Sequence, residues 1–317
     1  MTAPRDPATA PRWSLAVLPT PLHRLPALEA EVGGPLYLKR DDLIGFGLAG
    51  NKARALEYLL GEAVAARADV LVTAGSPASN FVAAAAMAAR VGGLSCDILV
   101  SGPPRDTTTL ALARACGAHL CFTGADREAL DGLVADHADR LRRQGRRPYP
   151  VPRGGATPAG ALGFASAAHE LAGQLDHEDA TVVLPTGSGA SLAGFLAGRA
   201  AIGARWRVYG VSVSRPAALI RGQILDLADR CAALAGTPAP DPDDLRLVDA
   251  VGAGFGQPSE RDRASARLAL HRAGVLLDGT YGAKALTALA DLDLEGPAVL
   301  WHGGGLPGAL ALTGTPG

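Results

Sequence analysis

The residue of this 317-residue chain whose position most favours chemistry is Lys52. It follows a glycine-rich turn that contains Gly45, Gly47 and Gly50, and the apolar-periodic segment after it predicts a helix to about Ala66. A lysine at the start of a helix can reach into a cleft while its backbone stays on a rigid element. The same pattern also fits a solvated surface lysine with no chemical role, so other segments of the chain are needed to distinguish the two possibilities.

A second segment, PTGSGASLAG at residues 185–194, has the composition of a phosphate-binding turn. It follows a predicted strand at 181–184 and begins a helix, and this arrangement presents backbone N–H groups and the positive end of a helix to an anion. Ser188 and Ser191 add hydroxyl donors. The run has neither a Walker lysine nor the spacing of a dinucleotide fingerprint, so it favours a single phosphate. A tight turn without a ligand is the alternative.

Two more predicted strands end in residues that suit a binding site. The strand at 70–72 leads to Ser79 and Asn80 at the start of an alanine-rich helix, where either side chain could simply cap the helix. The strand at 298–301 ends in His302 and three glycines, which permit close approach of a backbone to a flat ligand.

With these motifs in this order, the chain resembles the pyridoxal-phosphate enzymes of the 1-aminocyclopropane-1-carboxylate (ACC) deaminase and D-cysteine desulfhydrase family. That family has the two-lobed tryptophan-synthase-β-like fold, fold type II. The resemblance covers nearly the whole chain and is most specific in the run KRDDL…GNKxR. The matching segments are LPTPLHRLPALEAEVGGPLYLKRDDLIGFGLAGNK (18–52), SNF (79–81), GSGASLAG (187–194), VGAGFG (251–256), LDGTYGAKAL (277–286) and HGGGLPG (302–308).

The resemblance assigns roles to individual residues. Lys52 would hold pyridoxal 5'-phosphate as a Schiff base, which suits lysine because its pKa falls readily on burial. Asn80 would hydrogen-bond the phenolate oxygen of the cofactor, Ser79 would contact the substrate carboxylate or transfer a proton, and Tyr281 would stack on or stand beside the pyridine ring. The phosphate would lie in the turn formed by Gly187, Ser188, Gly189, Ala190 and Ser191.

Five positions depart from the pattern of the family. Ala55 replaces a second lysine that contributes to the phosphate site, and Phe81 follows Ser-Asn where histidine or glutamine is usual. Phe255 stands in place of a tyrosine. Gly303 replaces the threonine of an HTGG run, although it would still line the cofactor site. Gly282 replaces the glutamate that follows the stacking tyrosine in the deaminases.

The changes at Gly282 and Gly303 remove both usual partners of the pyridine nitrogen. Without an acid beside it the ring is a weaker electron sink, so we expect β-elimination or β-replacement of a good leaving group in preference to opening of an aminocyclopropane. An Asp or Glu from another segment at that nitrogen would overturn this hypothesis. Phe81, Phe255 and His302 are expected in the substrate pocket. The two phenylalanines predict a larger or less polar substrate, with drift within the family as the alternative, and His302 either shuttles protons or orients backbone.

Two lobes are expected, because a chain of this length exceeds the usual size of a single core. Residues 1–52 and 161–317 would form the large pyridoxal-phosphate-binding domain, and residues 53–160 a small inserted α/β domain. The cofactor would lie between them at the carboxyl ends of strands. Apolar runs that alternate with helical patterns predict an α/β fold with parallel-rich sheets covered by helices. The runs are residues 36–38, 70–72, 98–100, 120–122, 182–184, 208–213 and 298–301.

Composition argues against several other classes of function. The formal net charge is −1 and basic runs are short, so nothing indicates a nucleic-acid partner. No apolar stretch is long enough to span a bilayer. The four cysteines have no metal-ligand spacing and no paired framework, which predicts free thiols, no metal and a cytoplasmic location. Residues 1–13 have no apolar core and predict a mobile tail in place of a signal peptide.

The leading interpretation is a pyridoxal-phosphate-dependent lyase or deaminase, which by resemblance would be a homodimer. Its substrate would be a small amino acid, with the D-configuration as one option, and β-elimination would give a keto acid and ammonia. A specialised biosynthetic enzyme of β- or γ-replacement is the alternative. A non-catalytic homologue that binds the cofactor or a partner protein is a third reading, against which the intact Lys52, Ser79, Asn80 and Tyr281 argue.

Overall fold

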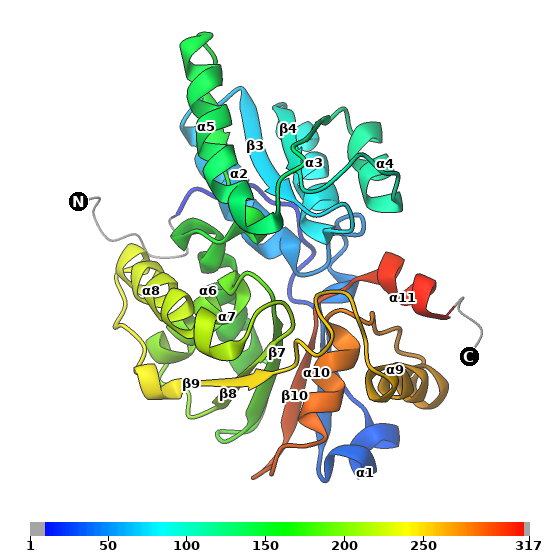
Figure 1. Ribbon diagram of the computed structural model, residues 1–317. Coiled ribbons are helices and arrows are strands. Elements are labelled where there is room, and N and C mark those ends of the chain that lie inside the picture. Colours follow the sequence, from blue (N-terminus) through cyan, green and yellow to red (C-terminus); the bar gives the residue numbers. More distant parts are fainter. Residues whose placement is uncertain (1–9, 314–317) are drawn as a thin grey trace.

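The computed structural model describes residues 10–313, which form two lobes, each built around its own sheet (Figure 1). The sheet of the larger lobe has the strand order β1-β2-β10-β7-β8-β9. Strand β1 pairs antiparallel with β2, and the other pairs are parallel. The strands are β1 (Leu22–Arg24), β2 (Leu36–Arg40), β7 (Thr181–Thr186), β8 (Arg207–Ser212), β9 (Leu245–Asp249) and β10 (Ala298–His302).

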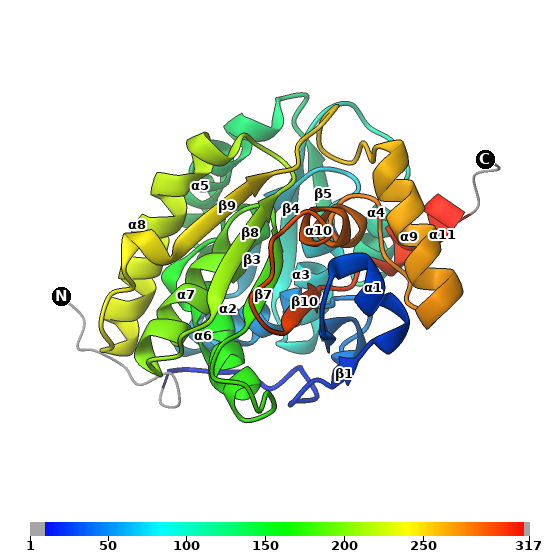
Figure 2. The ribbon, with the colours of Figure 1, turned by 90° about the horizontal axis from the view of Figure 1, so that it is seen from below.

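Helices cover both faces of this sheet, which is why its central strands read as continuous apolar runs (Figure 2). In β7, Val182 and Leu184 pack with α6 to α8, whereas Val183 packs with α9 and α10 on the other face. The helices are α6 (Pro158–Ala172), α7 (Ala190–Ala201) and α8 (Ala217–Ala235) on one face, and α9 (Glu260–Ala273), α10 (Gly282–Leu289) and the short α1 (Glu29–Val32) on the other.

The smaller lobe has a parallel sheet in the order β5-β4-β3-β6, and all of its strands lie between residues 53 and 160. Helices α2, α3 and α4 pack on one face and α5 on the other. The elements are α2 (Lys52–Ala65), β3 (Val70–Gly75), α3 (Asn80–Val91), β4 (Ser95–Val100), α4 (Thr108–Ala115), β5 (His119–Phe122), α5 (Leu130–Arg143) and β6 (Pro148–Pro150). Helix α11 (Leu306–Thr313) follows β10, and short 3₁₀ turns lie at η1 (Pro26–Leu28), η2 (Asp41–Leu43), η3 (Arg127–Ala129), η4 (Arg153–Gly155) and η5 (Pro242–Asp244).

Close packing of helices joins the two lobes. Helix α2 lies against α6, which in turn lies against α7. A Cβ atom at Gly163 would be 2.2 Å from the carbonyl oxygen of Arg54, and a Cβ atom at Gly194 would be 2.0 Å from that of Ala161. Only glycine fits at these two crossings, because any side chain would push the helices apart.

The α/β fold with parallel-rich sheets covered by helices is confirmed, and each apolar run named above lies in or overlaps a strand. Strands β1, β6 and β9 were not expected. All three are edge strands, which need less burial and therefore lack a continuous apolar run. The four cysteines are free thiols.

Residues 1–9 of the expected tail lie outside the described part of the chain, but the expectation is wrong for residues 10–13. The backbone N–H of Trp13 donates to the carbonyl oxygen of Glu57 at 2.9 Å, and the guanidinium of Arg12 pairs with the Glu57 carboxylate at 2.6 Å. This segment therefore docks on α2, an interaction between distant residues that its own composition does not reveal.

A buried cluster of charged side chains connects the end of β2 to both lobes. Arg54 of α2 donates to both carboxylate oxygens of Asp41 at 2.8 Å and to both oxygens of Glu170 of α6 at 2.9 Å. Lys39 of β2 also pairs with Glu170, and the indole N–H of Trp301 donates to Asp41 at 2.8 Å. Because two cations face two carboxylates, each buried charge of the cluster has a partner.

Replacing Glu170 by glutamine should lower the free energy of unfolding by about 3 kcal/mol, because Arg54 and Lys39 would lose a buried counter-charge. Burial alone would raise the pKa of Glu170, but the hydrogen bonds and charges of Arg54 and Lys39 outweigh it and hold this pKa at about 2. The pKa is thus depressed from its ordinary value of 4.5, so the stabilisation is complete above pH 4.5 and is lost as the pH falls towards 2.

Urea unfolding curves from neutral pH down to about pH 2 would measure this contribution. Glu178→Gln is the matched control, since that side chain is 85% exposed and its pair with Arg205 lies on the surface, where such pairs contribute about 0–1 kcal/mol. Two results would contradict this stabilising role of the buried charged cluster. One is an equal loss of unfolding free energy in the two variants, and the other is a pH dependence of stability in Glu170→Gln that matches that of the wild type.

Candidate functional site

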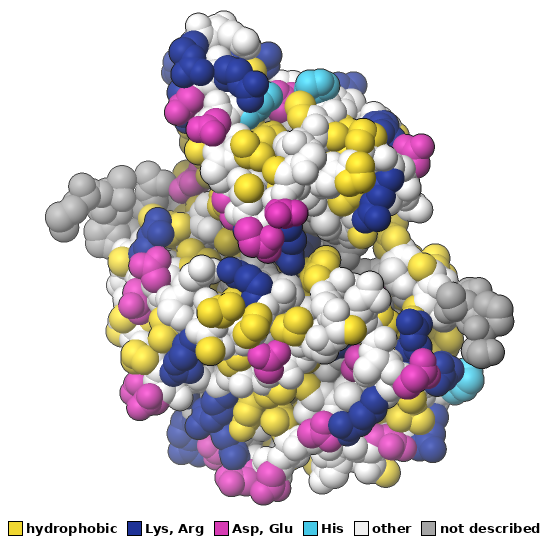
Figure 3. Space-filling view, in the orientation of Figure 1, with side chains coloured by type: hydrophobic (Ala, Val, Ile, Leu, Met, Phe, Trp, Pro, Cys, Tyr) yellow, Lys and Arg dark blue, Asp and Glu magenta, His cyan; other side chains and the backbone are white. Residues whose placement is uncertain are grey.

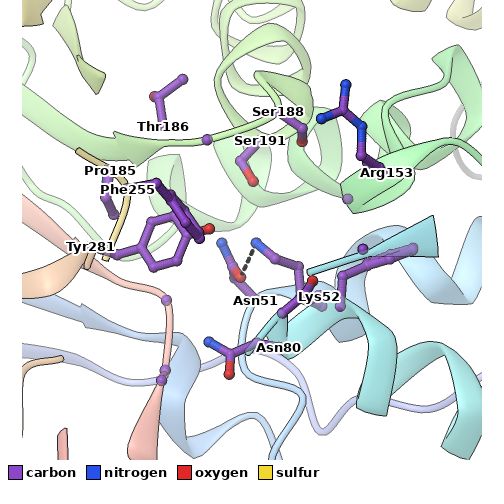
Figure 4. A pocket seen from close by; sticks show the side chains of 18 of the residues that line it. Asn51, Lys52, Asn80, Arg153, Pro185, Thr186, Ser188, Ser191, Phe255 and Tyr281 are labelled. Atoms are coloured by element: carbon purple, nitrogen blue, oxygen red, sulfur yellow. Dashed lines mark hydrogen bonds between the residues drawn. The ribbon is translucent and has the colours of Figure 1, made fainter. Parts of the chain in front are cut away.

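A cleft between the two lobes lies at the carboxyl ends of the strands of both sheets, where α/β folds place their ligands. Its empty space, including the open mouth, is about 890 Å³. The turns after β3, β6, β7 and β10 line it, together with the start of α2 and the loop before α9. Figure 4 shows polar and aromatic side chains from both lobes around this space.

Lys52 is the first residue of α2 and lies in the cleft (Figure 4). The backbone N–H of Asn51 donates to the carbonyl oxygen of Gly303 at 3.0 Å, and a Cβ atom at Gly50 would lie 2.1 Å from the same oxygen. The turn before Lys52 is thus fixed to the end of β10. The Nζ atom of Lys52 donates to Oδ1 of Asn51 at 2.9 Å and is 5.9 Å from the ring centre of Tyr281.

The surroundings of Lys52 change its acid–base behaviour. Burial lowers the pKa of Lys52 to about 8, although the negative charges of Asp278 and Asp41 oppose the change. A useful fraction of the amine is therefore neutral near neutral pH. Since only the neutral amine can attack an aldehyde or accept a proton, Lys52 can act as a nucleophile and as a general base.

The N-terminus of α3 contributes polar groups to the same cleft. Ser79 occupies the N-cap position and Asn80 is the first residue of the helix, yet neither side chain makes a hydrogen bond to another described residue. The alternative that these side chains only cap the helix is therefore not realised. Their free polar groups and the positive end of the helix dipole suit a carboxylate or another anion.

The turn between β7 and α7 lies on the other side of Lys52 (Figure 4). Within residues 10–313, neither the N–H groups of Gly187, Ser188 and Gly189 nor the hydroxyls of Ser188 and Ser191 have a hydrogen-bond partner. Gly189 precedes the helix with φ of 93°. This set of donors at a helix N-terminus fits a phosphate monoester. Ala190 is buried and lies outside the cleft lining, so its expected contact with the phosphate stays a prediction.

Tyr281 and Phe255 form an aromatic wall of the cleft. Their ring centres are 6.0 Å apart and the rings meet edge to face at 77°. A Cβ atom at Gly187 would be 3.2 Å from the hydroxyl of Tyr281, so this ring stands beside the β7–α7 turn. Burial raises the pKa of Tyr281 to about 12, and its phenol therefore stays protonated and can donate a hydrogen bond.

Asp278, which sequence reasoning did not single out, also lines the cleft. Its oxygens accept from the backbone N–H groups of Thr280, Tyr281 and Gly282 at 3.0 Å, so it caps α10 and positions Tyr281. Burial raises the pKa of Asp278, and these three hydrogen bonds oppose that rise. Among the described lining residues it is the one carboxylate. That the cofactor nitrogen lacks an acidic partner stays a prediction, with Asp278 as the group to test.

Local packing is tight at two of the departures from the family pattern. A Cβ atom at Gly303 would lie 3.1 Å from the side chain of Asn51, and a Cβ atom at Gly282 would lie 3.0 Å from that of Leu277. A larger residue at either position would therefore need its neighbour to move by a few tenths of an ångström. Gly303 itself lines the cleft.

Two residues expected in the substrate pocket are less accessible than the sequence suggested. Phe81 touches the cleft but is only 2% exposed, and its ring packs beside Gly155 inside the small lobe. His302 is 3% exposed, has Asp42 at 3.5 Å as its charged neighbour, and lies outside the lining. Burial also lowers the pKa of His302, so a neutral imidazole behind the cleft wall is the state that the structure favours.

Sequence reasoning also missed Asn51, Arg127 and Arg153, which line the cleft. Asn51 could have been noticed as the neighbour of Lys52. The guanidinium of Arg127 lies 4.4 Å from the ring centre of Phe255, a contact between segments far apart in the chain. Arg153 follows β6, one of the strands that the sequence did not reveal, so no pattern indicated its position.

Other kinds of site find little support in the part of the chain that the structure describes. No three His, Cys, Asp or Glu side chains of residues 10–313 are placed to hold a metal ion. No helix among these residues combines the length and the apolar character that crossing a membrane requires.

Comparison with known proteins adds sequence relatives. The family model for pyridoxal-phosphate-dependent enzymes matches residues 13–302. A putative ACC deaminase of Pyrococcus horikoshii is 32% identical over 308 residues, which cover 95% of this chain and 94% of that protein. A D-cysteine desulfhydrase of Yersinia enterocolitica is 33% identical over 325 residues, which cover 98% of each chain.

Solved structures agree with the sequence relatives. A crystal structure of an ACC deaminase homologue matches with a TM-score of 0.90 at 32% identity, covering 96% of this chain and 97% of that one. A fungal L-serine ammonia-lyase from Rhizomucor miehei shares the fold, with a TM-score of 0.68 at 22% identity and coverage of 94% and 97%. With an amine suited to an aldehyde at Lys52 and a turn suited to a phosphate, the chain belongs to the pyridoxal-phosphate-dependent enzymes of the ACC deaminase and D-cysteine desulfhydrase family, and pyridoxal phosphate is its cofactor.

Proposed function

We propose that this protein is a lyase that removes a β-substituent and the amino group from a small amino acid, with D-cysteine as the first candidate substrate. The observation that carries the proposal is the position of Lys52, whose pKa is lowered to about 8 between the polar N-termini of α3 and α7. The D-cysteine desulfhydrase named above supports this choice of substrate at 33% identity. As part of this proposal, the protein would be located in the cytoplasm and would form a homodimer.

Two anion sites on either side of Lys52 would orient the reactants. The free donors of the β7–α7 turn would hold the phosphate of the cofactor, and Ser79 and Asn80 at the start of α3 would bind the substrate carboxylate and the polar edge of the cofactor ring. Tyr281 would stand beside the ring. This arrangement would bring the α-carbon of the substrate within reach of the Lys52 amine.

Lys52 would serve as the base of the reaction. Its neutral Nζ would accept the proton from the α-carbon, after which the bond between the β-carbon and sulfur breaks and sulfide leaves with the bonding electrons. Bound pyridoxal phosphate supplies the electron sink that makes the α-proton acidic. Addition of water then gives pyruvate and ammonia, so the atoms of cysteine and water balance those of the products.

The absence of an acidic or hydroxyl side chain at Gly282 and Gly303 favours a second candidate, a β- or γ-replacement enzyme on a modified amino acid. Neither position offers an acidic side chain, and both oxygens of Asp278 already accept hydrogen bonds. A pyridine ring that is a weaker electron sink still allows a good leaving group to depart from the substrate. A second nucleophile could then add in its place. Added thiols or amines would divert the product from pyruvate to a substituted amino acid if this candidate is right.

The Lys52→Ala variant should lack the visible absorption band that the wild-type protein shows with its cofactor, since it has no amine at this position to hold the aldehyde. With D-cysteine, release of sulfide and pyruvate should fall by about 10³-fold, the size of a general-base contribution. Lys52→Arg is the matched control. It keeps the positive charge, and we expect it to lose both signals as well.

Two outcomes separate the desulfhydrase from the non-catalytic reading, and a third tests the role of Lys52. A wild-type band that D-cysteine changes, with sulfide released, supports the desulfhydrase. A band that a panel of D- and L-amino acids leaves unchanged supports the non-catalytic reading. Activity retained in Lys52→Arg would mean that a positive charge, and not a nucleophilic amine, is what the site requires.

The pH dependence of cofactor uptake should reflect the pKa of Lys52. Apo-protein should gain its visible band faster as the pH rises through about 8, because the fraction of neutral amine increases, and the rate should level off above that pH. Stopped-flow absorbance with excess pyridoxal phosphate measures this rate. Asp278→Asn should move the midpoint to lower pH, because removal of the negative charge favours the neutral amine. A rate that ignores pH between about 6 and 9 would contradict the assignment.

A further inference from the structure

Three cationic side chains line the cleft among the described residues: Lys52, Arg127 and Arg153. Lys52 is hydrogen-bonded to Asn51, and Arg127 lies over the ring of Phe255. Arg153 differs from both, because it belongs to the small lobe but lies next to the phosphate-binding turn of the large lobe. No function described above uses it.

Arg153 is brought to that turn by the residue that follows it. A Cβ atom at Gly154 would be 2.5 Å from the hydroxyl oxygen and 2.9 Å from the Cβ atom of Ser188, so the backbone of η4 touches the β7–α7 turn. Figure 4 shows the side chains of Arg153 and Ser188 at the same end of the cleft, away from Tyr281. A guanidinium is therefore placed beside unpaired N–H and hydroxyl donors.

Asp131 of α5 fixes the orientation of this guanidinium. One oxygen of Asp131 accepts from Nε of Arg153 at 3.2 Å and from Nη2 at 3.0 Å, and the other accepts from its backbone N–H at 2.9 Å. The Nη1 group has no hydrogen-bond partner among the described residues. The Arg153 side chain is 20% exposed, so it is held in place and still open to the cleft.

The charges around the β7–α7 turn favour an anion with more than one negative charge. The turn itself offers only neutral donors and the partial positive charge of a helix end, about half an elementary charge. Basic side chains lie at the opening of the cleft, with acidic side chains beside them (Figure 3). Burial lowers the pKa of Arg215, and the charges of Arg153 and Arg127 lower it further, whereas the charges of Glu128 and Asp131 oppose the change. A phosphate dianion beside Arg153 would offset part of this positive charge.

We propose that Arg153 binds the phosphate group of the cofactor through its free Nη1, so that the phosphate is held by the small lobe as well as by the β7–α7 turn. The preference of guanidinium for phosphate oxygens fits this role. The proposal concerns cofactor binding and does not depend on which amino acid is the substrate. It also gives the pair with Asp131 a function, since a guanidinium that is already oriented loses less entropy on binding.

The test compares pyridoxal phosphate with pyridoxal, which lacks the phosphate, as ligands of the apo-protein. Dissociation constants come from the visible absorbance at equilibrium and need no turnover. Arg153→Ala should weaken the binding of pyridoxal phosphate about 10- to 100-fold, which corresponds to the loss of a charged hydrogen bond. It should change the dissociation constant of pyridoxal by no more than about twofold. Arg153→Lys should recover part of the loss, because it keeps the charge but not the planar donor group.

Two further variants complete the design. Arg142→Ala is the matched control, because this arginine of α5 pairs with Asp139 on the surface, is 50% exposed and lies outside the cleft lining; it should bind both ligands like the wild type. Asp131→Asn should weaken the binding of pyridoxal phosphate less than Arg153→Ala does. Inorganic phosphate should slow the uptake of pyridoxal phosphate by wild-type apo-protein more than by Arg153→Ala.

Each possible result either supports or overturns phosphate binding by Arg153. A loss confined to pyridoxal phosphate supports the proposal, and unchanged pyridoxal binding shows that the variant is folded. Equal losses for both ligands would overturn it, as would unchanged affinity for both. If Arg153→Ala keeps its cofactor affinity but loses the spectral response to acidic amino acids such as D-aspartate, the guanidinium serves the substrate and the proposal is wrong.

Discussion

The pairing of Arg54 with Asp41 is the constraint on which the rest of the structure depends. Arg54 lies two residues after Lys52 in the same helix, and neither partner of the pair is more than 1% exposed. Through Glu170 and Trp301 the same charges reach α6 and β10. A guanidinium buried in this way has few alternative positions, because each would leave a charge without a partner. The start of α2, and with it Lys52, therefore has one place relative to both sheets.

The geometry of the cleft follows from that placement. Because the parallel strands of both sheets end at the same opening, the turns that follow β3 and β7 present two helix N-termini to one space, with Lys52 between them. Donors that would be satisfied in an ordinary cap are left free in both turns. The site is thus prepared for two anionic groups at once, as expected for a cofactor phosphate and an amino-acid carboxylate.

The sequence predicted the central strands, the phosphate-type turn and the position of Lys52, since these depend on short runs of residues. It could not predict the edge strands β1, β6 and β9, whose pairing comes from their neighbours more than from their own composition. It also could not show that Ser79 leaves its helix uncapped, or that His302 lies behind the cleft wall. Each of these depends on contacts between residues far apart in the chain, which no local pattern records.

The segment before β1 has a consequence of its own. The carboxylate of Glu57 in α2 is 1% exposed and receives the backbone N–H groups of Leu15 and Ala16 at 2.8 and 2.9 Å, besides the guanidinium of Arg12. These residues lie against the helix that begins at Lys52, so the segment before β1 helps to fix the position of α2. A chain shortened to begin after Ala16 would leave the buried carboxylate of Glu57 without these donors, within the same helix that begins at Lys52.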